Sequence, residues 1–250
     1  MPHFPHFNPN LFPRLARWGA VFIAVLAVSF LSLTVSALAQ YHSSDQSSAV
    51  SHGSNNPNSV DSALKALKEG NARFVAGQST NPRQNKEFLA QLVINGQTPL
   101  AAVLSCSDSR SPVEKIFDLG FGDLFVVRAG GATPGVDQIG SLEYAVDHLG
   151  VPVIVVLTHT YCGAIAAALS ETKSTGALGE MLAKLNPVAK AVEELDSSKR
   201  LDAAIKMSAV LFREQLSLVS PVIADAVKTG RLKVISGVHD LDTGVVSFHE

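Results

Sequence analysis

Apolar runs and helical patterns alternate along most of the chain after residue 59. Three short runs, residues 100–104, 124–127 and 151–157, are apolar without polar alternation, which indicates strands covered on both faces of a parallel sheet. A fourth strand is predicted at residues 232–235, which are apolar except for Lys233. A polar turn at residues 240–244 leads to a last run at 245–248, which predicts a hairpin that ends in an antiparallel edge strand.

Helical patterns separate these runs, because apolar residues recur between them at helical spacing. The first helix follows a cap at Ser59 or Asp61 and ends before Gly77. The others are predicted at residues 86–95, 139–149, 163–169, 178–195 with an interruption at Pro187, 201–218 and 221–227. Strands that alternate with helices imply an α/β fold, with a central, mostly parallel sheet flanked by helices.

The N-terminal 39 residues have the pattern of a signal peptide. Arg14 and Arg17 precede a stretch without charge, residues 18–35, and Ala37-Leu38-Ala39 supplies the small residues that signal peptidase requires. We therefore expect residues 1–39 to be a signal peptide of an exported, periplasmic protein. The apolar stretch is also at the lower limit for spanning a bilayer, so an uncleaved membrane anchor is the alternative.

Two further segments complete the predicted organisation. Residues 40–59 are rich in Ser, Asn, Gly and His, which is typical of a flexible linker. Residues 60–250 form one folded domain, since their length suits a single core. Hydrophobic residues make up 46% of the chain, charged residues 17%, and the formal net charge is −2. Lys and Arg are scattered rather than clustered, which argues against a nucleic-acid partner.

The residues that carry chemistry follow two of the predicted strands. Cys106, Asp108 and Arg110 come after the run 100–104, and His159 and Cys162 come after the run 151–157. Open α/β sheets build their sites at the carboxyl ends of parallel strands, so we expect these residues to lie close together. Two thiolates and an imidazole are ligands that suit zinc.

Simpler interpretations exist for the same residues. Two cysteines in an exported protein often form a disulfide, and an isolated histidine is more often a hydrogen-bonded core residue than a metal ligand. A disulfide between Cys106 and Cys162 explains neither His159 nor the charged pair Asp108 and Arg110. The H-x-x-C spacing beside C-x-D-x-R favours the metal site.

The two motifs resemble those of the β-class carbonic anhydrase family. The similar positions are Cys106-Ser-Asp-Ser-Arg110 and His159-Thr-Tyr-Cys162-Gly163-Ala164, with further likeness from about Ala63 to Val246. The resemblance implies four parallel strands plus an antiparallel edge strand, and a homodimer or dimer-based oligomer. It also implies zinc (Zn²⁺) held by Cys106, His159 and Cys162, with Asp108 and Arg110 as a catalytic dyad.

The implied reaction is the reversible hydration of carbon dioxide to bicarbonate by attack of a zinc-bound hydroxide. Asp108, kept ionised by Arg110, would orient that hydroxide, whereas an inactive closed form would use Asp108 as a fourth zinc ligand. One alternative is a hydrolase of carbonyl sulfide or carbon disulfide with the same ligands. The other is a non-catalytic protein in which the cysteines form a disulfide or a structural metal site.

Overall fold

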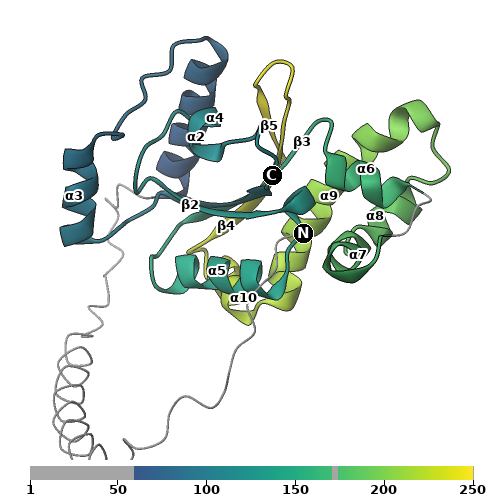
Figure 1. Ribbon diagram of the computed structural model, residues 1–250. Coiled ribbons are helices and arrows are strands. Elements are labelled where there is room, and N and C mark those ends of the chain that lie inside the picture. Colours follow the sequence, from purple (N-terminus) through teal and green to yellow (C-terminus); the bar gives the residue numbers. More distant parts are fainter. Residues whose placement is uncertain (1–58, 171–173, 250) are drawn as a thin grey trace, which may run out of the picture. The chain divides into compact units, whose positions relative to one another are not determined.

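The computed structural model describes residues 59–170 and 174–249, and its centre is a five-stranded sheet in the order β2-β1-β3-β4-β5 (Figure 1). The strands are β1 (Ala101–Cys106), β2 (Leu124–Ala129), β3 (Val153–His159), β4 (Lys233–His239) and β5 (Val246–His249). Strands β1 to β4 pair in parallel, and β5 pairs antiparallel with β4. The expected fold class is confirmed.

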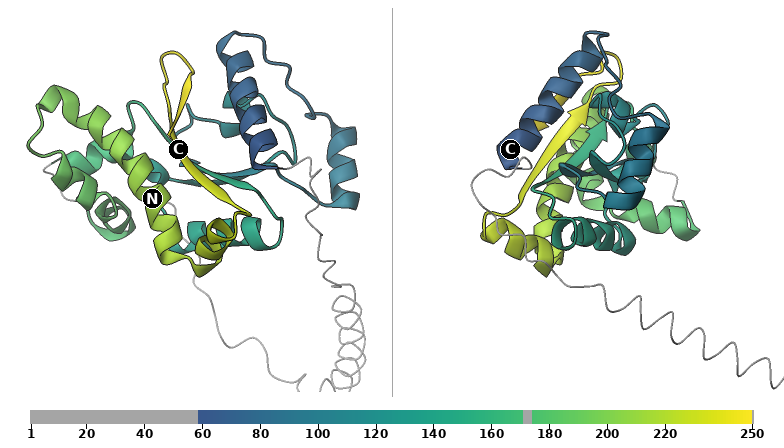
Figure 2. Two further views of the ribbon diagram at one scale, coloured as in Figure 1. Left: turned by 180° about the vertical axis from the view of Figure 1, so that it is seen from behind. Right: turned by 90° about the vertical axis from the view of Figure 1, so that its left-hand side faces the viewer.

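Helices cover both faces of this sheet (Figure 2). The elements are α2 (Val60–Val75), α3 (Lys86–Asn95), α4 (Val113–Ile116), the 3-10 helix η1 (Gly130–Ala132), α5 (Val136–Asp147), α6 (Gly163–Leu169), α7 (Gly176–Ala183), α8 (Asn186–Ala191), α9 (Ser197–Val219) and α10 (Pro221–Lys228). Ala102 and Ile154 face a core built with α5, α9 and α10, whereas Ala101 and Val153 face a core built with α2 and α4. Successive strand residues alternate between these cores because side chains alternate along a strand.

Both central strands are buried along their whole length, as the unbroken apolar runs predict. The strands extend further than the runs, so that Cys106 is the last residue of β1 and His159 is the last residue of β3. The sequence analysis predicts that both residues lie just after a strand, and this is wrong because each is part of the strand itself. Strand pairing continues through the polar residues because each still finds a backbone partner in the neighbouring strand.

The helical boundaries differ from expectation at several places; helix α9, for example, begins at Ser197 rather than residue 201. The segment 178–195 forms two separate helices, and the break falls before Pro187, which lies in the first turn of α8. Proline is tolerated there because the N–H groups of the first turn have no acceptor within the helix, so no helical hydrogen bond is lost. Helix α5 begins at Val136 rather than residue 139, and Gln138 accepts a hydrogen bond from the Gly135 N–H at 3.1 Å. Helices α4 and η1 are too short for periodicity to reveal.

Helix α2 is attached to the C-terminal hairpin by one buried amide. The Asn71 side chain donates to the carbonyl oxygens of Ile116, at 3.1 Å, and Gly244, at 2.9 Å. Its oxygen accepts from the Val246 N–H at 2.9 Å. A Cβ at Gly70 would lie 1.8 Å from the Phe117 carbonyl oxygen, so only glycine allows α2 to approach the backbone at Phe117 this closely. These contacts fix the position of the β4–β5 turn.

The predicted signal peptide, residues 1–39, and all of the predicted linker except Ser59 lie outside the described residues. Both assignments stay predictions. Within residues 59–170 and 174–249, no helix has both the length and the apolar composition needed to cross a bilayer.

Candidate metal centre

Sheet order brings the two ligand motifs together. Strands β1 and β3 are parallel neighbours, so Cys106 and His159 end at the same edge of the sheet. Cys162 follows as the N-terminal cap residue of α6. The two Sγ atoms and one imidazole nitrogen all lie within 4.8 Å of one another, and the three residues are buried. Three candidate ligands therefore converge on one point, as expected from the strand ends.

The two cysteines are free thiols, and their sulfur atoms are 4.0 Å apart. That separation is about twice the length of a disulfide bond. Two Zn–S bonds at a tetrahedral angle would place the sulfur atoms about 3.8 Å apart. The observed spacing therefore suits a tetrahedral metal site better than a disulfide.

The imidazole of His159 is oriented as a metal ligand requires. Its Nδ1–H donates to the Thr160 carbonyl oxygen at 2.8 Å, which leaves the lone pair of Nε2 available. Among the described residues, Nε2 has no hydrogen-bond partner although the side chain is fully buried. A buried polar atom without a partner is costly, and a metal ion at this point would satisfy it. The donor set fits zinc.

The surroundings favour a thiolate at Cys106. The pKa of its thiol is lowered well below its usual value, chiefly because Cys162 donates a hydrogen bond to it, while burial opposes the shift. The Gly131 N–H also donates to its sulfur, at 3.2 Å. Gly131 reaches this position with φ of 65°, in the left-handed region that glycine tolerates best. The pKa of the Cys162 thiol is raised, chiefly by its hydrogen bond to the Cys106 sulfur and then by burial.

Asp108 and Arg110 form a bidentate ion pair beside the ligands. The Arg110 guanidinium donates from Nε to Oδ1 at 3.0 Å and from Nη2 to Oδ2 at 2.8 Å. The backbone N–H of Arg110 adds a third bond to Oδ1 at 2.9 Å. These donors hold the pKa of the Asp108 carboxyl well below its usual range. Its Oδ2 lies 3.8 Å from Nε2 of His159, so the ionised carboxylate faces the candidate metal position.

Arg128 is part of the site, a role that the sequence analysis missed. Its Nε donates to the Cys106 carbonyl oxygen at 2.9 Å, and its Nη2 donates to the Asp108 carbonyl oxygen at 2.6 Å. Arg128 lies near the end of β2, the other neighbour of β1. The sequence does contain a signal for this role: Arg128 is a charged residue directly after the apolar run 124–127. The carboxyl end of that strand lies at the same edge of the sheet as Cys106 and His159.

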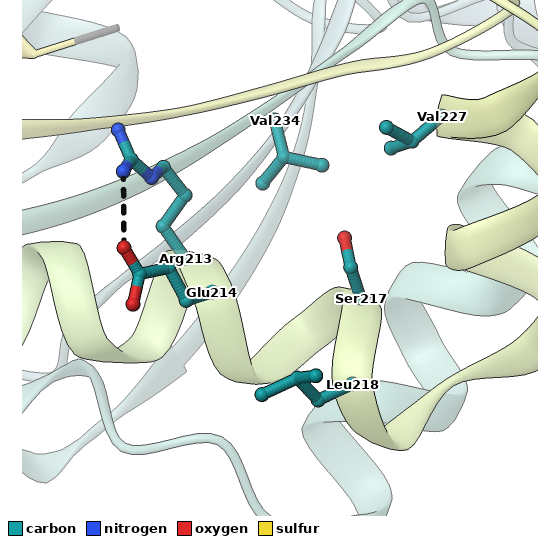
Figure 3. Close-up of a pocket in the computed structure, with 6 residues that line it drawn as sticks. All are labelled: Arg213, Glu214, Ser217, Leu218, Val227 and Val234. Carbon is teal, nitrogen blue, oxygen red and sulfur yellow. Dashed lines mark hydrogen bonds and ion pairs between the residues drawn. The ribbon is translucent and has the colours of Figure 1, made fainter.

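A separate pocket lies where α9, α10 and β4 meet (Figure 3). It is lined by Arg213, Glu214, Ser217, Leu218, Val227 and Val234. Its two charged residues pair with each other at 3.4 Å. The pocket shares no residue with the Cys-His-Cys cluster and has no comparable set of convergent donors, so we place the chemistry at the cluster.

Comparisons with known proteins agree on one family. A family profile described as carbonic anhydrase matches residues 101–246. Carbonic anhydrase 2 of Mycobacterium tuberculosis is 38% identical over 186 residues, which cover 73% of this chain and 89% of that protein. A carbonic anhydrase of Mycolicibacterium smegmatis is 54% identical over 108 residues, which cover 43% of this chain and 52% of that protein.

Solved structures give the same result for the fold. A tetrameric β-carbonic anhydrase of Sordaria macrospora aligns with a TM-score of 0.60 and 28% identity, over 75% of this chain and 96% of that one. A Coccomyxa β-carbonic anhydrase aligns with a TM-score of 0.58 and 25% identity, over 74% and 83%. The chain is therefore an enzyme of the β-carbonic anhydrase family.

Proposed function

We propose that this protein catalyses the zinc-dependent, reversible hydration of carbon dioxide to bicarbonate. One observation carries the proposal: the buried Cys106, His159 and Cys162 converge within 4.8 Å beside a carboxylate that Arg110 holds in place. Three protein ligands leave a fourth position for water, which is the pattern of a catalytic rather than a structural zinc site.

Zinc bound here would act as a Lewis acid that lowers the pKa of a water molecule toward neutrality. Asp108 is ionised at neutral pH, so its Oδ2 can accept a hydrogen bond from that water and direct a lone pair toward the carbon of the substrate. Arg110 keeps both carboxylate oxygens engaged, which holds Asp108 away from the ligand set.

Asp108 also gives the site a second arrangement. Its Oδ2 is already 3.8 Å from the ligand atom of His159. If the Arg110 pair opens, the carboxylate is close enough to become a fourth ligand in place of water, and the site would be inactive. We propose the paired arrangement as the active form.

Metal analysis together with kinetics tests the proposal. Purified protein should contain about one zinc per subunit, and stopped-flow assays should show carbon dioxide hydration that is lost on chelation and restored by zinc. Faster turnover of carbonyl sulfide or carbon disulfide than of carbon dioxide would assign the alternative hydrolase. Zinc without turnover of any of these substrates would leave only a structural metal role and refute the proposal.

We further propose a homodimer or dimer-based oligomer. Large apolar side chains are exposed in the single chain, among them Val93 and Ile94 of α3 at 80% and 83% and Val136 of α5 at 83%. Strand β2 is an edge of the sheet and can accept further contacts. Light scattering coupled to size-exclusion chromatography should give at least twice the subunit mass, and a monomer at micromolar concentration would contradict this.

We also propose export to the periplasm, with cleavage after Ala39. The mature protein should begin at Gln40 and lack Trp fluorescence, because Trp18 is the only tryptophan. Mass spectrometry of protein from its native host tests this. Recovery of an intact N-terminus with membranes would show instead that the segment is an anchor.

A further inference from the structure

A tyrosine between two candidate metal ligands connects them to a distant turn. Tyr161 lies in the segment His159 to Cys162, and its side chain is 57% exposed. Its hydroxyl group donates to Oδ2 of Asp242, in the β4–β5 turn, at 2.9 Å.

The neighbouring residue makes the same connection through its backbone and side chain. The Thr160 N–H donates to the His239 carbonyl oxygen at 3.0 Å, and its Oγ1 accepts from the Leu241 N–H at 2.9 Å. We call these two bonds and the Tyr161–Asp242 bond the loop clasp. It joins segments that are about 80 residues apart in the sequence.

The turn that receives the clasp is itself well fixed. Oδ1 of Asp240 accepts from the N–H groups of Asp242, at 3.0 Å, and Thr243, at 2.8 Å. The Gly244 N–H donates to the Asp240 carbonyl oxygen at 2.8 Å. Asp242 therefore offers its carboxylate from a turn whose shape does not depend on its own side chain.

The other side of Tyr161 faces the catalytic pair. Its carbonyl oxygen accepts from Nη2 of Arg110 at 3.3 Å, and the same nitrogen donates to Oδ2 of Asp108 at 2.8 Å. The backbone of Tyr161 has φ of 56°, a left-handed conformation that costs a non-glycine residue free energy and needs support from its surroundings. The clasp supplies that support.

We propose that Tyr161 is a positioning residue: anchored at Asp242, it orients its own carbonyl toward Arg110 and so fixes the guanidinium that holds Asp108. This inference rests on the proposed function, in which the Asp108 carboxylate directs the attacking water. Tyr161 touches neither the substrate nor a ligand atom in this role. It acts through Arg110.

Two single substitutions, Tyr161→Phe and Asp242→Ala, remove the Tyr161–Asp242 bond of the clasp and leave both Thr160 bonds in place. Each should lower kcat for carbon dioxide hydration roughly three- to tenfold with KM nearly unchanged, since one solvent-exposed hydrogen bond is lost. The double variant should be no worse than the singles, because both remove the same bond. Asp242→Asn keeps an acceptor oxygen and should retain most of the activity. Tyr144→Phe, at an exposed tyrosine of α5, is the matched control and should match wild type.

Two measurements distinguish an effect of Tyr161 on the position of Arg110 from a general loss of structural stability. In an Arg110→Ala background, Tyr161→Phe should lower kcat no further, because the residue through which it acts is gone. Amide hydrogen exchange at Thr160 and Leu241 should be faster in Tyr161→Phe, with or without zinc. A thermal midpoint equal to that of wild type is expected for so exposed a contact.

The outcomes are distinct. Wild-type kcat, or wild-type exchange at Thr160 and Leu241, in both clasp variants would overturn the inference. An undiminished effect of Tyr161→Phe in the Arg110→Ala background would assign the clasp a purely structural role and overturn it as well. If wild-type protein does not hydrate carbon dioxide, the proposed function fails. The exchange measurement still tests whether the clasp holds residues 160–161 against the β4–β5 turn.

Discussion

Replacing Arg110 by alanine is the most direct test of the catalytic role that we propose for Asp108 and Arg110. The substitution removes two guanidinium bonds to the Asp108 carboxylate, at 3.0 and 2.8 Å, and leaves the backbone N–H bond at 2.9 Å. Without the guanidinium, the pKa of Asp108 rises toward the ordinary value of about 3.9. At pH 7 a carboxyl group with that pKa is protonated in only about one molecule in a thousand.

Protonation of Asp108 therefore cannot explain a loss of activity at pH 7. A loss of activity would instead show that Arg110 orients the Asp108 carboxylate. We expect kcat to fall about 10- to 100-fold, the usual effect of removing a residue that orients a group beside a metal. Zinc content should stay at the wild-type level, because Arg110 is not a ligand. A freed carboxylate can also approach the ligand set, since its Oδ2 begins 3.8 Å from Nε2 of His159.

Stopped-flow hydration assays measure kcat, and elemental analysis measures zinc in the same samples. Arg213→Ala is the control, because that arginine pairs with Glu214 in a separate pocket, and its kcat should match wild type. If protonation of Asp108 sets the lowest pH at which the enzyme is active, that pH should rise toward about 4 in Arg110→Ala. Without the guanidinium the pKa of Asp108 is higher, so the carboxylate is protonated at a higher pH. Near-normal turnover of Arg110→Ala at pH 7 would refute the role of the pair.

Three further predictions follow from the ligands and the packing of α2. Cys106→Ser, His159→Ala and Cys162→Ser should each lose zinc on dialysis, measured by elemental analysis, because three protein ligands leave little redundancy; retention of full zinc would contradict the ligand set. Metal-free protein treated with oxidised glutathione should lose both thiols to a disulfide in a thiol assay, since the sulfur atoms are 4.0 Å apart, while zinc-loaded protein keeps them. Gly70→Ala should lower the thermal midpoint by roughly 2–8 °C despite its better helix propensity, because its Cβ would meet the Phe117 carbonyl oxygen at 1.8 Å; an unchanged midpoint would show that α2 can shift.

Much of the fold was predictable because its signals are local. Runs such as residues 151–157 are apolar throughout, since β3 is covered on both faces, and this pattern identifies a buried parallel strand without knowledge of its neighbours. The helix at 86–95 and the helix at 163–169 agree with α3 and α6 at both ends. The break before Pro187 was placed incorrectly, because proline fits the start of a helix as well as it ends one.

The sequence by itself determined the α/β class and the types of the candidate ligands, because both depend on residues within short segments. Only the tertiary structure decided which segments meet. Strand β1 pairs with β3, and β2 lies on its other side, so Cys106 has His159 close by and Arg128 against its carbonyl oxygen. Tyr161 reaches Asp242 in the same way, across 81 positions. Sheet order and turn position result from packing across both faces of the sheet, and no short segment contains that information.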